Sequence, residues 1–245
     1  MPSGCLLQDR PALVRAVRTY GRAVGTGETA VATSLFCQAW AVSVTREAIA
    51  GLVGARRVPD MASSNTLLLL DGTGRPAGSA LVAPRFAAVA GDDGAAADPR
   101  AEILPDDDAL FAWTRARLFD GHLGPLVEAL YDLAPVGRRL LWGNVAAATA
   151  GGFATLSARP VRPFDPDHVL PEATRLLDAS DSPTAGLVEL FPVAHRGGTR
   201  LFVRRQTCCL RYRLSDAPPT CLSCRLLPEP DRRRRITDRL DAIAD

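Results

Sequence analysis

Lysine is missing from this chain, because all 29 of its basic residues are arginine. Alanine is abundant as well, and a GC-rich coding sequence accounts for both biases. The 27 acidic residues leave a formal net charge of only +2. Such a balance gives no reason to expect nucleic acid or an anionic membrane as a partner.

Long apolar runs are also lacking. The N-terminus has no basic segment followed by an apolar stretch, so no secretory signal is predicted. Two uncharged stretches, residues 29–45 and 140–158, are long enough to test as membrane spans. The first contains several Thr, Ser and Gln side chains and the second is mostly Ala and Gly, so neither suits hydrocarbon. We expect a cytoplasmic protein with no stable membrane insertion.

The hydrophobic periodicity predicts an α+β fold that is rich in helix and has a small antiparallel sheet. Asp9 can cap a first helix, with Pro11 in its first turn. Asn144 is expected to cap a later one. Further helices are expected at residues 28–52, 107–119, 122–134, 144–157, 171–178 and 230–243, and strands at residues 67–70, 79–89, 187–193 and 199–203.

The acidic and small residues of segment 91–105 indicate a linker. It would separate an N-terminal helical and hairpin lobe, residues 1–90, from a C-terminal lobe, residues 106–245. The run of four arginines at 232–235 is expected to be a solvated face of the last helix.

Four of the six cysteines fall within a short C-terminal segment, as Cys208-Cys209 and, eleven residues later, Cys221-x-x-Cys224. In a C-x-x-C turn two sulfurs converge and nearby amides can hydrogen-bond them. Neighbouring strand residues point to opposite faces, so Cys208 and Cys209 can serve one site only if the strand ends at about Gln206. In a cytosolic protein, such clustering suggests metal or redox chemistry.

The residues alone leave three interpretations open. An iron–sulfur cluster needs four thiolates and tolerates irregular spacing. A structural zinc site also takes four thiolates but typically pairs two C-x₂₋₄-C knuckles. Disulfides or unliganded thiols are the third.

Six arginines and no acid lie between residues 195 and 214. Guanidinium groups near an anionic four-thiolate centre would favour its reduced form. They could also contact an anionic or oxygen-rich iron chelate, and the candidates are Arg204, Arg205, Arg211 and Arg213. Any one of them could instead be an ordinary exposed strand residue.

The run from Arg204 to Leu214, followed by Cys221-Leu222-Ser223-Cys224, resembles the FhuF-type ferric siderophore reductases. In that family a C-terminal C-C…C-x-x-C motif holds a [2Fe-2S] cluster. The segment Leu141-Trp142-Gly143-Asn144 is similar to a second family motif. The resemblance covers the C-terminal half of the chain, and the gap between the cysteine pairs is eleven residues where the family has ten.

The resemblance implies a C-terminal iron–sulfur segment at residues 208–224, with Cys208, Cys209, Cys221 and Cys224 as ligands and catalytic centre. It implies one-electron reduction of a ferric siderophore, hydroxamate or similar, to release Fe(II). Trp142 and Asn144 could line the substrate cleft. No flavin or nicotinamide site is evident, so an external donor such as a ferredoxin or an NAD(P)H-dependent reductase would be needed. The alternative is a siderophore-binding or interaction domain with a structural four-cysteine zinc site.

Overall fold

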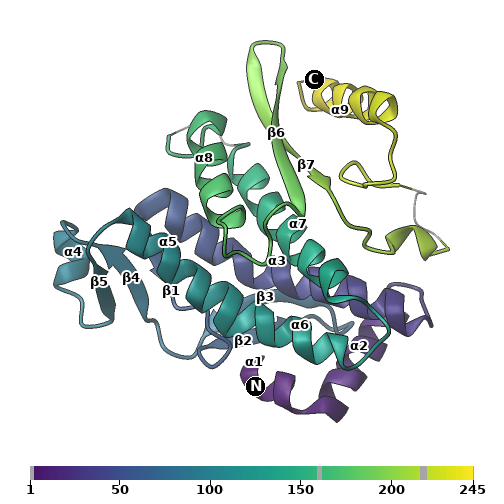
Figure 1. Cartoon of the computed structure of the whole chain (residues 1–245), viewed down its shortest axis with the longest axis horizontal. Coiled ribbons are helices and arrows are strands. Elements are labelled where there is room, and N and C mark those ends of the chain that lie inside the picture. The colour runs from purple at the N-terminus through teal and green to yellow at the C-terminus, as the bar shows by residue number, and fades with distance from the viewer. Residues whose placement is uncertain (1–2, 159–161, 216–219, 245) are drawn as a thin grey trace.

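The computed structural model describes residues 3–158, 162–215 and 220–244. Long helices form the body, and a β-hairpin with the last helix beside it projects from one side (Figure 1). The helices are α1 (Ser3–Gln8), α2 (Arg10–Ala23), α3 (Thr29–Ala55), α4 (Asp93–Ala96), α5 (Asp107–Arg115), π-helix η1 (Ala116–Leu123), α6 (Gly124–Tyr131), α7 (Arg138–Leu156), α8 (Pro166–Leu177), 3-10 helix η2 (Arg211–Arg213) and α9 (Glu229–Ala244). The strands are β1 (Arg57–Pro59), β2 (Thr66–Leu70), β3 (Pro76–Leu81), β4 (Phe86–Val89), β5 (Ala101–Leu104), β6 (Val188–His195) and β7 (Gly198–Arg205).

Aspartate side chains begin several of these helices. Asp9 accepts the amide N–H of Ala12 at 2.9 Å and so starts α2, as the sequence predicts. Asp106 and Asp165 do the same for α5 and α8. Each such cap satisfies an amide that has no partner inside the helix, and each places a negative charge at the positive end of the helix dipole.

Helices α3 and α7 form the centre of the molecule. They pack against each other more extensively than any other pair of described elements. α3 is buried on nearly all sides, with Phe36 and Trp40 fully enclosed. Gly152 of α7 lets the helices approach closely, because a Cβ there would lie 2.7 Å from Cδ1 of Ile49. The predicted α+β class with a long second helix is confirmed.

The sheets are small. β2 pairs with β3, and β6 with β7, as antiparallel hairpins, while β4 lies between antiparallel β1 and parallel β5. The single return strand expected at residues 79–89 is wrong, because the chain leaves β3 and enters another sheet as β4. Segment 91–105 is not an unstructured linker. It contains α4 and β5, and the main chain of β5 pairs with β4 throughout its length.

Helix α7 begins at Arg138, six residues before its expected start. Gly137 is its N-cap residue, and Leu141 is already buried in the first turns. Asn144 is therefore in the helix interior and not a cap, which corrects the prediction. α8 also begins early, because Asp165 caps it and Pro166 suits its first turn. No helix in the described part of the chain combines the length and hydropathy needed to cross a membrane.

A histidine links the core helix α3 to the loop before β2. Trp40 Nε1 donates to His122 Nε2 at 3.0 Å, so the ring proton is on Nδ1, which donates to the carbonyl of Met61 at 2.6 Å. His122 is fully buried. Burial lowers the pKa of His122 to about 4, although the Met61 carbonyl acts in the opposite direction. The ring is therefore neutral at physiological pH.

This geometry predicts acid sensitivity. The unfolded chain protonates His122 at its ordinary pKa of 6.5, whereas the folded protein does so only near pH 4. The folded state therefore loses stability as pH falls from 6.5 to 4, by about 3 kcal/mol in total. The free energies of unfolding of wild type and His122→Phe can be measured by urea titration. The difference between them, in favour of wild type, should shrink by that amount between neutral pH and about pH 4. A constant difference between the two proteins would contradict the assignment.

Candidate functional site

The first cysteine pair follows directly on strand β7. The strand ends at Arg205, as the cysteine spacing requires, and the chain then turns. Leu210 adopts a left-handed backbone with φ of 62°, and its N–H points at Cys208 Sγ at 3.4 Å. Cys208 and Cys209 therefore lie on turning backbone and not on a strand, which removes the geometric objection to their serving one site.

The second pair lies on a tight turn. Cys224 N–H donates to the carbonyl of Cys221 at 2.9 Å, and Leu226 N–H points at Cys224 Sγ at 3.4 Å. The amide of Arg205 donates to the carbonyl of Ser223, in the middle of the C-x-x-C, at 3.0 Å. This main-chain bond holds the second cysteine pair beside the end of β7, where the first pair begins.

The four thiols share one electrostatic environment. All are free; Cys209 and Cys224 are buried, and Cys208 and Cys221 are half-buried. Burial raises the pKa of Cys224, the Leu226 amide opposes this, and the charges of the other three thiolates raise it further. Among the described residues, no three Cys, His, Asp or Glu side chains are arranged as a metal site. The thiols therefore interact electrostatically but are not arranged as a closed ligand cage.

Helix α9 supports the C-x-x-C turn through arginine. The nearly inaccessible Arg232 donates to the carbonyls of Leu222 at 2.6 Å, Cys224 at 2.8 Å and Leu227 at 3.0 Å. Arg235 donates to the carbonyl of Thr220 at 2.9 Å. The prediction that the whole run 232–235 is a solvated face is therefore wrong for these two residues. The sequence gives no signal for their role, because neighbouring Arg233 and Arg234 are exposed.

On the opposite side, Arg205 extends from the end of β7 into the core, where only 2% of it is exposed. Its Nη1 donates to Gln38 Oε1 of α3 at 3.1 Å. Its Nη2 donates to Asn144 Oδ1 of α7 and approaches the Gly143 carbonyl at 3.5 Å. Arg205 therefore connects the cysteine segment to both central helices.

A second chain of hydrogen bonds completes this connection. Asn144 Nδ2 donates to the carbonyl of Ser34 at 2.8 Å and to its Oγ at 2.9 Å. The Ser34 hydroxyl donates to the carbonyl of Cys209 at 2.8 Å. We call Ser34, Gln38, Asn144 and Arg205 the buried polar network. Sequence analysis missed Ser34 and Gln38, although polar residues in a helix buried on all sides were a usable signal.

The segment Trp142-Gly143-Asn144 thus lies against the cysteine segment. Gly143 is essential to that contact, because a Cβ there would lie 1.8 Å from Thr207 Oγ1. Trp142 is half-buried and packs edge-on against Phe119, with ring centroids 6.4 Å apart. Asn144 is fully buried and its side chain is occupied by protein groups. In this structure Asn144 and Arg205 hold the cysteine segment in place and present no surface to a substrate.

The other candidate arginines have different surroundings. Arg204 pairs with Glu189 across the hairpin, and Arg213 pairs with Glu28 at the start of α3. Arg211 is exposed on η2. Of the four candidates, Arg204, Arg211 and Arg213 therefore remain accessible, whereas Arg205 is enclosed.

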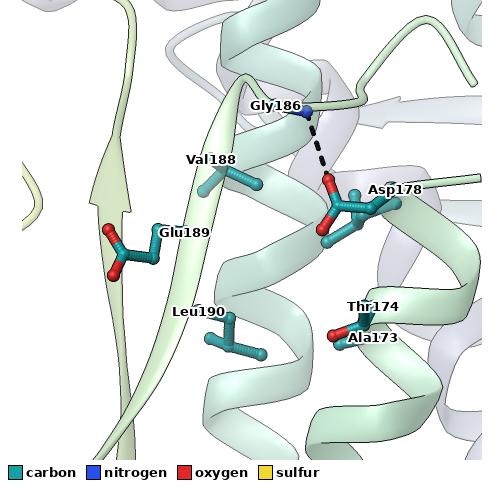
Figure 2. Close-up of a pocket in the computed structure, with 8 residues that line it drawn as sticks. Ala173, Thr174, Asp178, Gly186, Val188, Glu189 and Leu190 are labelled. Atoms are coloured by element: carbon teal, nitrogen blue, oxygen red, sulfur yellow. Dashed lines mark hydrogen bonds between the residues drawn. The ribbon is translucent and has the colours of Figure 1, made fainter.

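A separate pocket of about 200 Å³ lies between α8 and β6 (Figure 2). Val188 and Leu190 of β6 and Ala173 and Thr174 of α8 line it, and the amide of Gly186 donates to Asp178 Oδ1 at 3.1 Å at one end. The side chain of Glu189 points to the other side of the strand. No cysteine lines this pocket, so it is distinct from the thiol site.

Comparison with known proteins identifies the family of the chain. The family described as ferric iron reductase FhuF-like transporter matches residues 34–199, more than half of the chain. The chain belongs to this family. A search of curated proteins found no similar one. The matched range includes Ser34, Gln38 and the Trp142-Gly143-Asn144 segment, and it ends before the four C-terminal cysteines. Reduction of ferric iron, the activity in the family description, is an oxidoreductase reaction.

The contact between α7 and the cysteine segment can be tested with two glycines of one helix. Gly143→Ala forces a methyl group onto Thr207 and should destabilise the protein by about 1–3 kcal/mol. Gly151→Ala is the matched control, because its Cβ would meet nothing within 4 Å, and alanine should stabilise the helix by up to about 1 kcal/mol. Urea unfolding measures the change in free energy of unfolding for both variants. Equal changes at the two positions would contradict the packing described.

Proposed function

We propose that the protein reduces a ferric siderophore by one electron, using a [2Fe-2S] cluster bound by Cys208, Cys209, Cys221 and Cys224. The observation that carries this proposal is the main-chain bond from Arg205 to Ser223, which links the end of β7, three residues before Cys208, to the Cys221-x-x-Cys224 turn. Membership of a ferric iron reductase family supports the same chemistry.

The donor chemistry fits such a group. Four thiols without disulfide bonds are available, and backbone amides point at two of the sulfurs. Amide hydrogen bonds to cluster sulfurs are among the features that set the potential of these centres. When bound, the cluster supplies a site that accepts and gives up a single electron. A zinc ion could use the same four thiolates, so metal identity has to be measured.

The buried and the exposed residues of the site would have different roles. Cys209 and Cys224 are buried, and the buried polar network and Arg232 exclude water behind them. Cys208 and Cys221 are half-exposed and form the outer edge of the site. Electron donor and iron chelate would both approach this edge, where exposed Arg211 and Arg213 can donate hydrogen bonds to an oxygen-rich chelate or attract an anionic one.

The reaction balances with one external electron. A reduced ferredoxin or NAD(P)H-dependent reductase gives up one electron, and Fe(III) in the chelate becomes Fe(II). No bond of the siderophore is broken. Hydroxamate and similar hard oxygen donors bind Fe(II) much more weakly than Fe(III), so the iron leaves and the intact ligand takes up protons from water.

The decisive variant is Cys224→Ser, with Cys5→Ser as control because Cys5 is an exposed thiol on α1. After anaerobic reconstitution, wild type and the control should be red-brown, contain about two irons and two sulfides per chain, and give an EPR signal when reduced. Cys224→Ser should lose the iron and the ferric-chelate reduction while keeping its helical circular dichroism, because the main core lies outside the cysteine segment.

Two outcomes would overturn the proposal. A colourless wild type that holds one zinc and no sulfide would make the cysteines a structural zinc site. An iron-loaded wild type that is reduced, freed of excess dithionite, and then not reoxidised by a ferric hydroxamate would remove the siderophore-reductase assignment.

A further inference from the structure

Arg205 is a buried cation that lacks an acidic partner among the residues the structure describes. Its acceptors are the amide oxygens of Gln38 and Asn144 and the main-chain carbonyl of Gly143, all of them neutral. Its Nε is buried and has no hydrogen-bond partner. The positive charge is therefore solvated by dipoles and not neutralised.

Two other arginines have acidic partners: Arg232 is buried like Arg205, whereas the side chain of Arg56 is 27% exposed. Arg56 pairs with Glu172 at 2.6 Å, and Arg232 pairs with Glu229 at 3.2 Å. An enclosed charge without a counter-ion is costly, because desolvation removes the water that stabilised it. The hydrogen bonds to three neutral acceptors account for the planar fork of donors, but they leave the charge itself without a counter-ion.

The position of the charge relates it to the thiol site. Arg205 lies three residues before Cys208, its own amide bonds Ser223 inside the C-x-x-C turn, and its side chain bonds Asn144, which reaches the Cys209 carbonyl through Ser34. The guanidinium thus lies behind the site, on its buried side. Its field also acts on a thiol outside the four-cysteine site, that of Cys37 in α3: burial raises the pKa of Cys37 to about 12, and Arg205 opposes that rise.

We propose that Arg205 is the internal counter-charge of the four-thiolate site, placed to stabilise the additional negative charge that arrives with one electron. This inference rests on the proposed function. A four-thiolate [2Fe-2S] group is anionic, and one-electron reduction makes it more negative by one unit. A fixed positive charge in a low-dielectric environment favours that state more than an exposed arginine can. Arg205 is a positioning residue and does not touch the substrate.

The test is the midpoint potential of the reconstituted protein, measured by anaerobic dithionite titration against a reference dye. Arg205→Met removes the charge and keeps most of the volume, whereas Arg205→Lys keeps the charge and loses the planar fork. At fixed poise, the ratio of reduced to oxidised protein should fall at least tenfold in Arg205→Met, about 59 mV for a one-electron couple. It should change less than threefold in Arg205→Lys.

Two further variants complete the design. Asn144→Asp keeps nearly the same shape and gives Arg205 the carboxylate it lacks, so it should lower the potential in the same direction without deleting the arginine. Arg200→Met is the matched control. Arg200 lies on the same strand, and its Nη1 donates to the carbonyl of Ala158, away from the cysteines. At the same poise, the ratio of reduced to oxidised protein in Arg200→Met should stay within a factor of two of the wild-type ratio.

The outcomes separate this inference from the function on which it rests. Wild type that takes up no iron and sulfide refutes the proposed function itself. Loaded Arg205→Met and Asn144→Asp proteins with wild-type potentials refute the counter-charge and leave the function intact. If Arg205→Met does not fold, the potential of Asn144→Asp decides alone: a lowered value supports the inference and an unchanged one overturns it.

Discussion

The buried guanidinium of Arg205 connects parts of the protein that are far apart in sequence. Its side chain bonds Gln38 in α3 and Asn144 in α7, and its main chain bonds Ser223 in the C-x-x-C turn. The cysteine segments contribute few residues to the main apolar core. Their position therefore depends on hydrogen bonds. These are directional, and when they are buried, breaking one by displacement costs free energy because the polar groups have no water to bond instead. Arg205 sets the inner side of the site's geometry, and Arg232 of α9 holds the C-x-x-C turn.

Much of the architecture could be predicted from the sequence, because it follows from local rules. Asp9 before Pro11 specifies a helix start, the long uncharged stretch around Trp40 specifies a buried helix, and the cysteine spacing required the strand to end near Gln206. Errors arose where tertiary contacts decide. β5 is a strand only because β4 offers its edge, and α7 begins early, after Gly137, where burial of Leu141 extends the helix.

The candidate site was predictable only in part, for a related reason. The spacing of the cysteines indicates a candidate site, but no sequence pattern indicates which residues position them. Arg204 and Arg205 are adjacent and chemically identical, yet one forms an ion pair across the hairpin surface and the other lies in the core. Alternation along β7 sends them to opposite faces. Which face is buried depends on how the hairpin packs on α7, and no local pattern contains that information.

The use of arginine throughout the site has a physical basis beyond codon bias. Arg232 binds three main-chain carbonyls of the C-x-x-C region at once, and Arg205 bridges two helices while its amide serves a third segment. A planar fork with five N–H donors can do this in a fixed geometry, whereas a lysine ammonium is a flexible point charge. The thiol site is thus held between two buried guanidinium groups. Arg232 has a carboxylate partner in Glu229 and Arg205 has none among the described residues. The charge of Arg232 is therefore paired, whereas that of Arg205 is solvated only by neutral dipoles, in a part of the protein that water does not reach.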